Sequence, residues 1–265
     1  MGLFDTHAHY DDPRFAEDLA TLAEEMRQPS LHCPMGVETV VNIGCDVPTS
    51  RLCLELAEQY PFFYAAVGIH PQDAHTFNEE SLPALREMLR HPKAVAIGEV
   101  GLDYKYENAP RDVQKAVFRE MMALAEETGY PVIIHDRDAH GDCFDIIREF
   151  PRVTGIFHSY SASGEMARQL VKRGWYISFS GSVTFKNARG LPEAARQVPL
   201  ERLLVETDAP YLSPEPFRGK RNRSDYAFMT AAKLAELHGI SPEEMVNITR
   251  ENARRVFRFD EMLQK

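Results

Sequence analysis

The chain has 265 residues, of which 44% are hydrophobic and 26% are charged, and its formal net charge is −10. This composition is typical of a globular protein with a large core, and the acidic balance argues against a protein that coats DNA by charge alone. The four cysteines show no C-x-x-C spacing and no apolar run approaches the length of a membrane span, so we expect a cytoplasmic protein.

Strand-like apolar runs alternate with longer helix-like segments along the chain. Eight runs are rich in Val and Ile and nearly continuous in apolar character, which is typical of strands buried on both faces. They cover residues 2–9, 36–45, 62–70, 94–101, 131–135, 153–158, 175–181 and 202–210. Capping signals or apolar residues at three- and four-residue steps predict helices at 50–60, 78–90, 111–130, 163–174 and 241–257.

This alternation predicts an α/β fold, a (β/α)8 TIM barrel that forms one domain over residues 1–265. A doubly wound parallel sheet is the competing architecture. In a barrel of this kind the active site lies at the C-terminal ends of the strands. The polar residues that finish the predicted strands are therefore the candidates for function.

Side chains able to bind a metal finish six of the eight predicted strands. Residues two apart on a strand point the same way, so His7 and His9 leave one face together, with Asp5 in the same row. Alone, this pair is equally open to chance. The remaining strand ends carry His70, Glu99, His135, His158, and the pair Glu206 and Asp208. Clustered, partly buried carboxylates need a counter-charge, so the set predicts a metal site.

The predicted ligands His7, His9, His135 and His158, with the carboxylates Glu99 and Asp208, exceed the needs of one tetrahedral zinc. They suit two divalent metal ions that share a carboxylate and bridge a hydroxide.

Glu99 is the candidate bridge because it lies centrally in the series of strand ends. Asp208 could ligate one ion and accept the proton of an attacking water. Glu206 and Asp5 are expected to orient ligands from outside the coordination sphere. Imidazole permits Zn and carboxylate permits Mn or Mg, so the identity of the metal stays open.

Several long segments follow one another in the order and spacing of one known family. They are FDTHAHYDD, VGIHP, IGEVGLDY, PVIIHDRDA, FHSYSASGE, ETDAPYLSP and GKRNR. Over nearly its whole length the chain resembles the TatD family of metal-dependent deoxyribonucleases and hydrolases, which are amidohydrolase-like barrels. The resemblance implies that one metal is held by His7, His9, Glu99 and Asp208, that Glu99, His135 and His158 hold the other, and that His70 lies beside the substrate phosphate.

The sequence departs from the family pattern at a few positions. Gln72 stands where a second His commonly follows GIHP, and Ser159 with Tyr160 replaces the usual Cys-Phe pair. None of these residues is a predicted ligand. The departures therefore bear on substrate preference rather than on hydrolysis.

The segment FRGKRNR, residues 217–223, places four positive charges after the last predicted strand. We expect it to contact phosphate, with Arg221 and Asn222 as the substrate-binding residues, although a solvated loop is the alternative. Tyr104 and Tyr106 follow Glu99 and could stack on a base, but packing within their loop is the favoured reading.

The leading functional interpretation is a metal-dependent deoxyribonuclease of the metal-dependent hydrolase barrel type. Its substrate would be DNA or a phosphate ester. We expect neither membrane binding nor an obligate protein partner. One alternative is hydrolysis of another ester or an amide on the same dinuclear site. The other is an inactive barrel used as a binding module, against which the intact ligand set argues.

Overall fold

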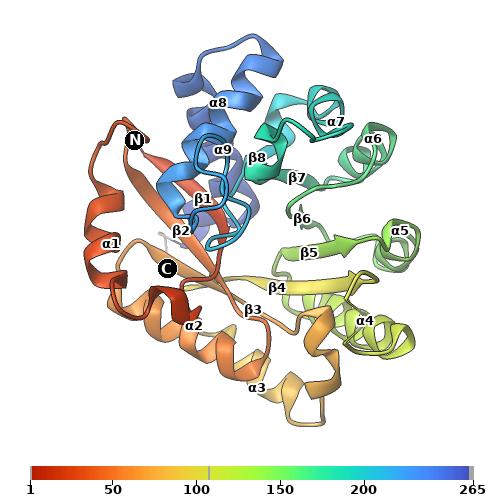
Figure 1. The fold of residues 1–265 in the computed structure, drawn as a ribbon. Coiled ribbons are helices and arrows are strands. Elements are labelled where there is room, and N and C mark those ends of the chain that lie inside the picture. Colours follow the sequence, from red (N-terminus) through yellow and green to blue (C-terminus); the bar gives the residue numbers. More distant parts are fainter. Residues whose placement is uncertain (1, 107, 263–265) are drawn as a thin grey trace.

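Eight parallel strands pair in sequence order in the computed structural model, which describes residues 2–106 and 108–262 (Figure 1). They are β1 (Leu3–Ala8), β2 (Val37–Ile43), β3 (Phe63–Val67), β4 (Ala94–Asp103), β5 (Val132–Arg137), β6 (Gly155–Phe157), β7 (Tyr176–Phe179) and β8 (Leu203–Val205). A parallel bridge between Ala8 and Ala209 closes the sheet on itself. The predicted (β/α)8 barrel is confirmed, because a doubly wound sheet would not run in consecutive order.

Helices surround the strands (Figure 1). The α-helices are α1 (Leu19–Arg27), α2 (Val47–Gln59), α3 (Ser81–Met88), α4 (Arg111–Thr128), α5 (His140–Glu149), α6 (Gly164–Lys172), α7 (Leu191–Gln197), α8 (Ala227–His238), α9 (Pro242–Val256) and α10 (Phe259–Met262). Short 3-10 helices are η1 (Pro13–Phe15), η2 (Pro71–Thr76), η3 (Gly181–Thr184), η4 (Leu200–Arg202) and η5 (Ser224–Tyr226). Across the described ranges, no helix combines the length and the apolar character needed to cross a bilayer.

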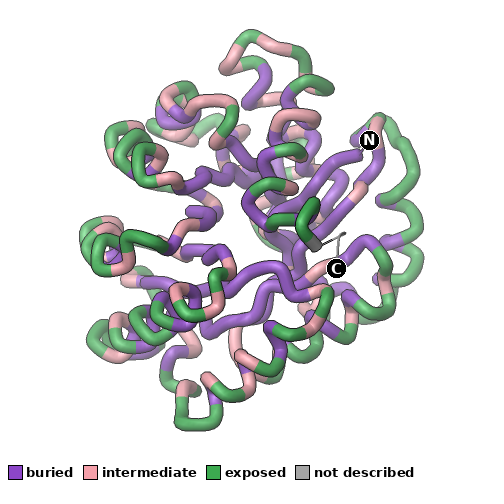
Figure 2. The backbone as a smooth tube through the Cα atoms, turned by 180° about the vertical axis from the view of Figure 1, so that it is seen from behind, coloured by how far each residue is buried: buried purple, intermediate pink, exposed green. Residues whose placement is uncertain are grey.

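The barrel interior is a packed core that takes a side chain from every strand. Its members include Phe4, Val41, Ala66, Val95, Ile133, Ile156, Tyr176 and Leu204. After α9 the chain turns under the barrel, and Phe257 stacks on Phe4 with ring centroids 5.8 Å apart. Figure 2 shows the strands buried and the outer helix faces exposed. Apolar side chains fill this core. The polar side chains at the strand ends therefore lie at the C-terminal mouth of the barrel.

Strands β4 and β5 approach each other closely at Gly101, which pairs with His135. Gly101 has φ +137°, and a Cβ added to it would lie 2.1 Å from the carbonyl oxygen of His135. Any side chain there would push β5 away from β4. Glycine at this position therefore keeps His135 within reach of residues on β4.

Candidate metal centre

All six predicted metal ligands converge at the C-terminal mouth of the barrel. His7, Glu99 and His135 lie within β1, β4 and β5, while the others follow β1, β6 and β8. Their side chains are between 0% and 17% exposed. Parallel strands bring their carboxyl ends to one edge, so residues as far apart in the sequence as His7 and Asp208 meet in one place.

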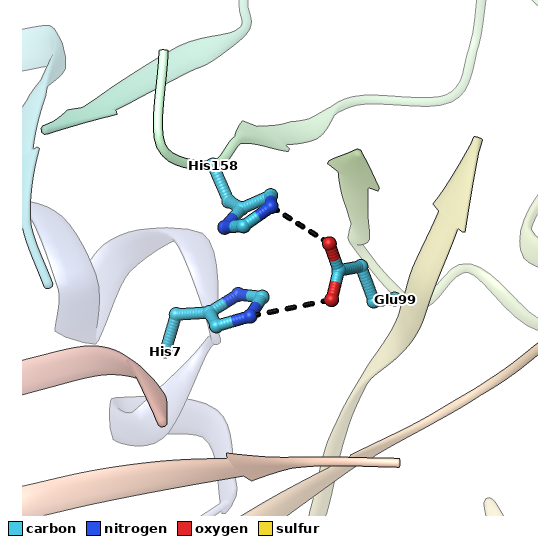
Figure 3. Close-up of side chains that lie close together, drawn as sticks. All are labelled: His7, Glu99 and His158. Atoms are coloured by element: carbon cyan, nitrogen blue, oxygen red, sulfur yellow. Dashed lines mark ion pairs between the residues drawn. The ribbon is translucent and has the colours of Figure 1, made fainter. Parts of the chain in front are cut away.

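Glu99 lies at the centre of this cluster, and its two oxygens face different partners (Figure 3). Oε1 is 2.7 Å from Nε2 of His158 and 2.5 Å from Nδ1 of His135. Oε2 is 3.4 Å from Nε2 of His7 and 3.8 Å from Nε2 of His9. One carboxylate thus borders two separate sets of imidazole nitrogens, as a bridging ligand must.

A second carboxylate completes the set on the β1 side. Oδ1 of Asp208 is 3.7 Å from Nε2 of His7 and 3.5 Å from Nε2 of His9, and these two nitrogens are 3.1 Å apart. Three sets of residues each bring their own ligand atoms within 4.8 Å of one another. They are His7–Glu99–His158, His7–His9–Asp208 and His70–Glu99–His135. Imidazole nitrogens and carboxylate oxygens at this spacing fit divalent cations.

The outer ring nitrogens of two histidines, His9 and His158, have hydrogen-bond acceptors as partners. Nδ1 of His9 is 3.2 Å from the carbonyl oxygen of Ile43, an acceptor that holds the proton on that nitrogen. Nδ1 of His158 donates in the same way to Glu206, at 3.2 Å. Each ring therefore turns Nε2 toward the centre, and this nitrogen can bind a metal once it has lost its proton.

His135 is oriented by a residue that the sequence reasoning missed, Asp103. Its Nε2 donates to Oδ2 of Asp103 at 3.2 Å, which leaves Nδ1 facing Glu99. Asp103 is fully buried and also accepts from the backbone of Lys105 and from the side chain of Gln72. The signal was available: Asp103 lies four residues after Glu99 on β4, on the same strand face.

His70 differs from His9 and His158 in which ring nitrogen keeps the proton when the ring is neutral. Burial lowers its pKa to about 3, so the ring is neutral at pH 7. Its Nδ1 accepts a hydrogen bond from the backbone N–H of Gln72 at 3.1 Å, which leaves the ring proton on Nε2. That nitrogen is 3.8 Å from Oε1 of Glu99. His70 therefore faces the centre as a hydrogen-bond donor rather than as a metal ligand.

The charges of the cluster are strongly coupled. Burial disfavours a charged His158, yet Glu99 and Glu206 raise its pKa well above the usual value. Burial also opposes the ionisation of Glu99, but the surrounding imidazoles, His158 first, hold its pKa well below the ordinary range. The carboxylates are thus ionised and protons on the imidazoles offset them. Divalent cations would supply the same positive charge.

The two residues expected to orient ligands lie beside the centre, in different ways. Glu206 is fully buried, and its Oε1 accepts from both His158 and the backbone N–H of Ser159. Asp5 accepts from the backbone N–H of His7 and from the hydroxyl of Thr207 at 2.6 Å. Asp5 therefore joins the backbone of β1 to Thr207, in the segment after β8, and does not touch an imidazole.

The predicted substrate contacts in residues 217–223 are engaged with the protein itself. Asn222 is fully buried, and its side-chain N–H groups donate to the carbonyl oxygens of Thr207 and Tyr211. The guanidinium of Arg221 pairs with Asp18 at 2.6 Å. Our expectation for Asn222 is corrected: it holds the loop after β8 in place, because every polar atom of its amide is already bonded within the chain.

Known proteins are similar in sequence to this chain over nearly its whole length. A family model described as TatD related DNase matches residues 4–258. The uncharacterized metal-dependent hydrolase YabD of Bacillus subtilis is 45% identical over 260 residues, which are 97% of this chain and 100% of that protein. YcfH of Escherichia coli K12, also an uncharacterized metal-dependent hydrolase, is 41% identical over 98% of this chain and 97% of its own length.

Solved structures agree on the fold. The crystal structure of YJJV, a TatD homolog from Escherichia coli K12, superposes with a TM-score of 0.88 at 30% identity. It covers 97% of this chain and 98% of its own. The similarity in sequence and structure therefore spans the whole barrel, including every strand that contributes to the metal cluster.

Proposed function

The chain belongs to the TatD family of metal-dependent hydrolases, and from this premise we propose that it is a deoxyribonuclease that hydrolyses DNA phosphodiester bonds at a two-metal centre. The observation that carries the proposal is the position of Glu99. Its two oxygens border separate sets of imidazoles, one near His135 and His158 and the other near His7. Such an arrangement suits two cations that share one carboxylate.

In the proposed centre one ion is held by His7, His9, Glu99 and Asp208, and the other by Glu99, His135 and His158. When bound, two divalent ions activate a water molecule and withdraw negative charge from the phosphate. The chain's contribution is to hold imidazole rings so that their ligand nitrogens face the centre. The hydrogen bonds of His9 to Ile43 and of His158 to Glu206 do this before any metal arrives.

Asp208 is the proposed proton acceptor. Burial opposes its ionisation, but a hydrogen bond from His9 and the charges of neighbouring imidazoles lower its pKa, so it is ionised at neutral pH. At 17% exposure its side chain is the most open of the six proposed ligands. An ionised oxygen at the open side of the centre can take the proton that an attacking water loses.

His70 is the proposed donor to the substrate. Its Nε2 carries the ring proton and points toward the centre from the loop after β3. A phosphate oxygen that approaches Glu99 would otherwise meet another anion. The N–H of His70 stabilises the negative charge on that oxygen as the bond to phosphorus forms.

The test is a metal-titrated cleavage assay with single-stranded DNA labelled at the 3′ or the 5′ end. We expect cleavage that a chelator abolishes, a His135→Ala variant at least ~100-fold slower, and a His91→Ala control that cleaves normally, since His91 pairs with Glu58 outside the cluster. If no metal supports cleavage of DNA but a non-nucleic ester is hydrolysed, the nuclease assignment is wrong and the broader hydrolase remains. If nothing is hydrolysed, the barrel is a binding module.

A further inference from the structure

Two exposed tyrosines stand on opposite sides of the barrel mouth. Among the described residues, the large hydrophobic side chains that are clearly exposed are Leu31, Leu52, Tyr106 and Tyr211. Tyr106, 50% exposed, follows β4, and Tyr211, 49% exposed, follows β8. The strand order places β4 and β8 diametrically across the barrel from each other. Packing was expected for Tyr106, but half of this residue is open to solvent.

Each of the two rings carries an arginine on one face. The guanidinium carbon of Arg14 is 4.3 Å from the ring centroid of Tyr211, and that of Arg137 is 4.8 Å from the ring centroid of Tyr106. Arg14 is held in place by Asp12, whose oxygens accept at 2.8 and 2.7 Å. In a chain with a net charge of −10, this puts a cation beside each exposed ring.

Both tyrosines are also tied to the metal centre through their backbones. The N–H of Tyr106 donates to Oδ1 of Asp103 at 2.9 Å, and the other oxygen of the same carboxylate accepts from His135. The N–H of Tyr211 donates to the carbonyl oxygen of Asp208 at 2.8 Å. The ring of Tyr211 lies 6.4 Å from that of His9, centroid to centroid.

These backbone hydrogen bonds fix where the two rings stand relative to the proposed ligands. Tyr104, two residues before Tyr106, shows what packing looks like here: its hydroxyl donates to Asp142 and its ring is partly buried beneath Arg111. The hydroxyl of Tyr211 also donates to an aspartate, Asp12, at 3.4 Å. Exposure is what sets Tyr106 and Tyr211 apart, because about half of each residue is open to solvent at a fixed position relative to the ligands. Rigid exposed rings beside cations are the elements with which proteins bind unpaired nucleobases.

We propose that Tyr106 with Arg137 and Tyr211 with Arg14 form two nucleobase subsites on either side of the scissile phosphate. This inference rests on the proposed nuclease function. Each tyrosine stacks on a base, and each arginine backs the ring and faces the adjacent phosphate backbone. In a duplex the base faces are covered by their neighbours, so these subsites accept only a single strand or a strand with splayed bases.

The test compares a thymidine tetranucleotide with a tetramer of the same length whose sugars are tetrahydrofuran abasic residues. The variants are Tyr106→Ala and Tyr211→Ala, with Tyr106→Phe and Tyr211→Phe as ring-retaining counterparts. Leu52→Ala on α2 serves as a control that removes an exposed apolar side chain away from the mouth. Metal content and thermal unfolding are measured for every variant.

We expect each alanine variant to raise KM for the thymidine tetramer by ~5-fold or more, with little change in kcat. The phenylalanine variants and Leu52→Ala should behave as the wild type, and the abasic tetramer should be cleaved equally by all forms. Equal losses on both tetramers, or losses in kcat with lower metal content, would show that the tyrosines only support the fold. Failure of the wild type to cleave either tetramer would refute the nuclease function itself, and the subsites with it.

Discussion

The replacement of Asp103 by Asn probes how strongly the surrounding residues control the metal centre. Burial opposes ionisation of Asp103, but hydrogen bonds, from His135 first, hold its pKa well below the usual range, so it is a carboxylate at pH 7. It accepts four hydrogen bonds: from His135 and Gln72 on one oxygen, and from the backbones of Lys105 and Tyr106 on the other. Asn has the same shape as Asp, but its NH2 group cannot accept a hydrogen bond, so Asn cannot accept all four.

The expected magnitude follows from the two orientations of the new amide. With its NH2 toward His135, the ring must move its proton to Nδ1, the atom that faces Glu99 at 2.5 Å, and so loses its lone pair for a metal. With its NH2 toward the loop, the N–H groups of Lys105 and Tyr106 lose their acceptor. We expect the metal beside His135 to bind ~10- to 100-fold more weakly, or about 1.4–2.7 kcal/mol.

The assay is calorimetric titration of Mn²⁺ or Zn²⁺ into metal-free protein. In the Asp103→Asn variant one of two binding events should weaken, while the event that involves His7, His9 and Asp208 keeps its affinity. Asp142→Asn is the matched control, because Asp142 accepts from Tyr104 nearby without touching a proposed ligand. Unchanged binding of both ions, or equal weakening of both, would refute the reasoning.

Three further predictions follow from the same geometry. Glu99→Gln should weaken both metal-binding events and lower kcat/KM by ~10³-fold or more, measured by metal analysis and DNA cleavage. Burial lowers the pKa values of His135 and His158, but the neighbouring carboxylates raise them by more, so the net shift is upward. A metal ion must therefore displace protons from these rings. Affinity should therefore rise with pH, and titrations in buffers of different ionisation enthalpy should detect released protons. Asn222→Ala should cost about 3 kcal/mol in chemical denaturation because two buried carbonyls lose their donors, whereas Arg221→Ala, which breaks an exposed pair, should cost less than about 1 kcal/mol.

The fold was predictable because its strands are buried on both faces. Continuous apolar runs marked all eight strands, and their alternation with helices fixed the architecture. The helices that were predicted include those with clear caps, such as α2 with Asp46, α6 with Ser163 and α9 with Ser241. The site residues were predictable for a simpler reason: parallel strands must deliver their last side chains to the same mouth.

The remainder depends on tertiary contacts that local patterns do not record. Helices α1, α5, α7, α8 and the short α10 were missed. The first four have no side-chain cap at the N-terminus, a feature they share with the predicted α3 and α4. The loop after β8 is positioned by distant partners, such as the hydrogen bond between Tyr10 and Ser224. The positive charges of residues 217–223 made Arg221, and Asn222 beside it, look like substrate contacts. Only the folded loop reveals that Asp18 and two backbone carbonyls hold them.

The central claim is that six residues from five strand ends hold two cations with Glu99 between them. The most direct test is a crystal structure of protein loaded with Mn²⁺, with anomalous difference maps recorded at the manganese edge. The account predicts two peaks, roughly 3.5–4 Å apart, one on each side of the Glu99 carboxylate. A single peak, or peaks that do not contact Glu99, His135 and Asp208, would contradict it.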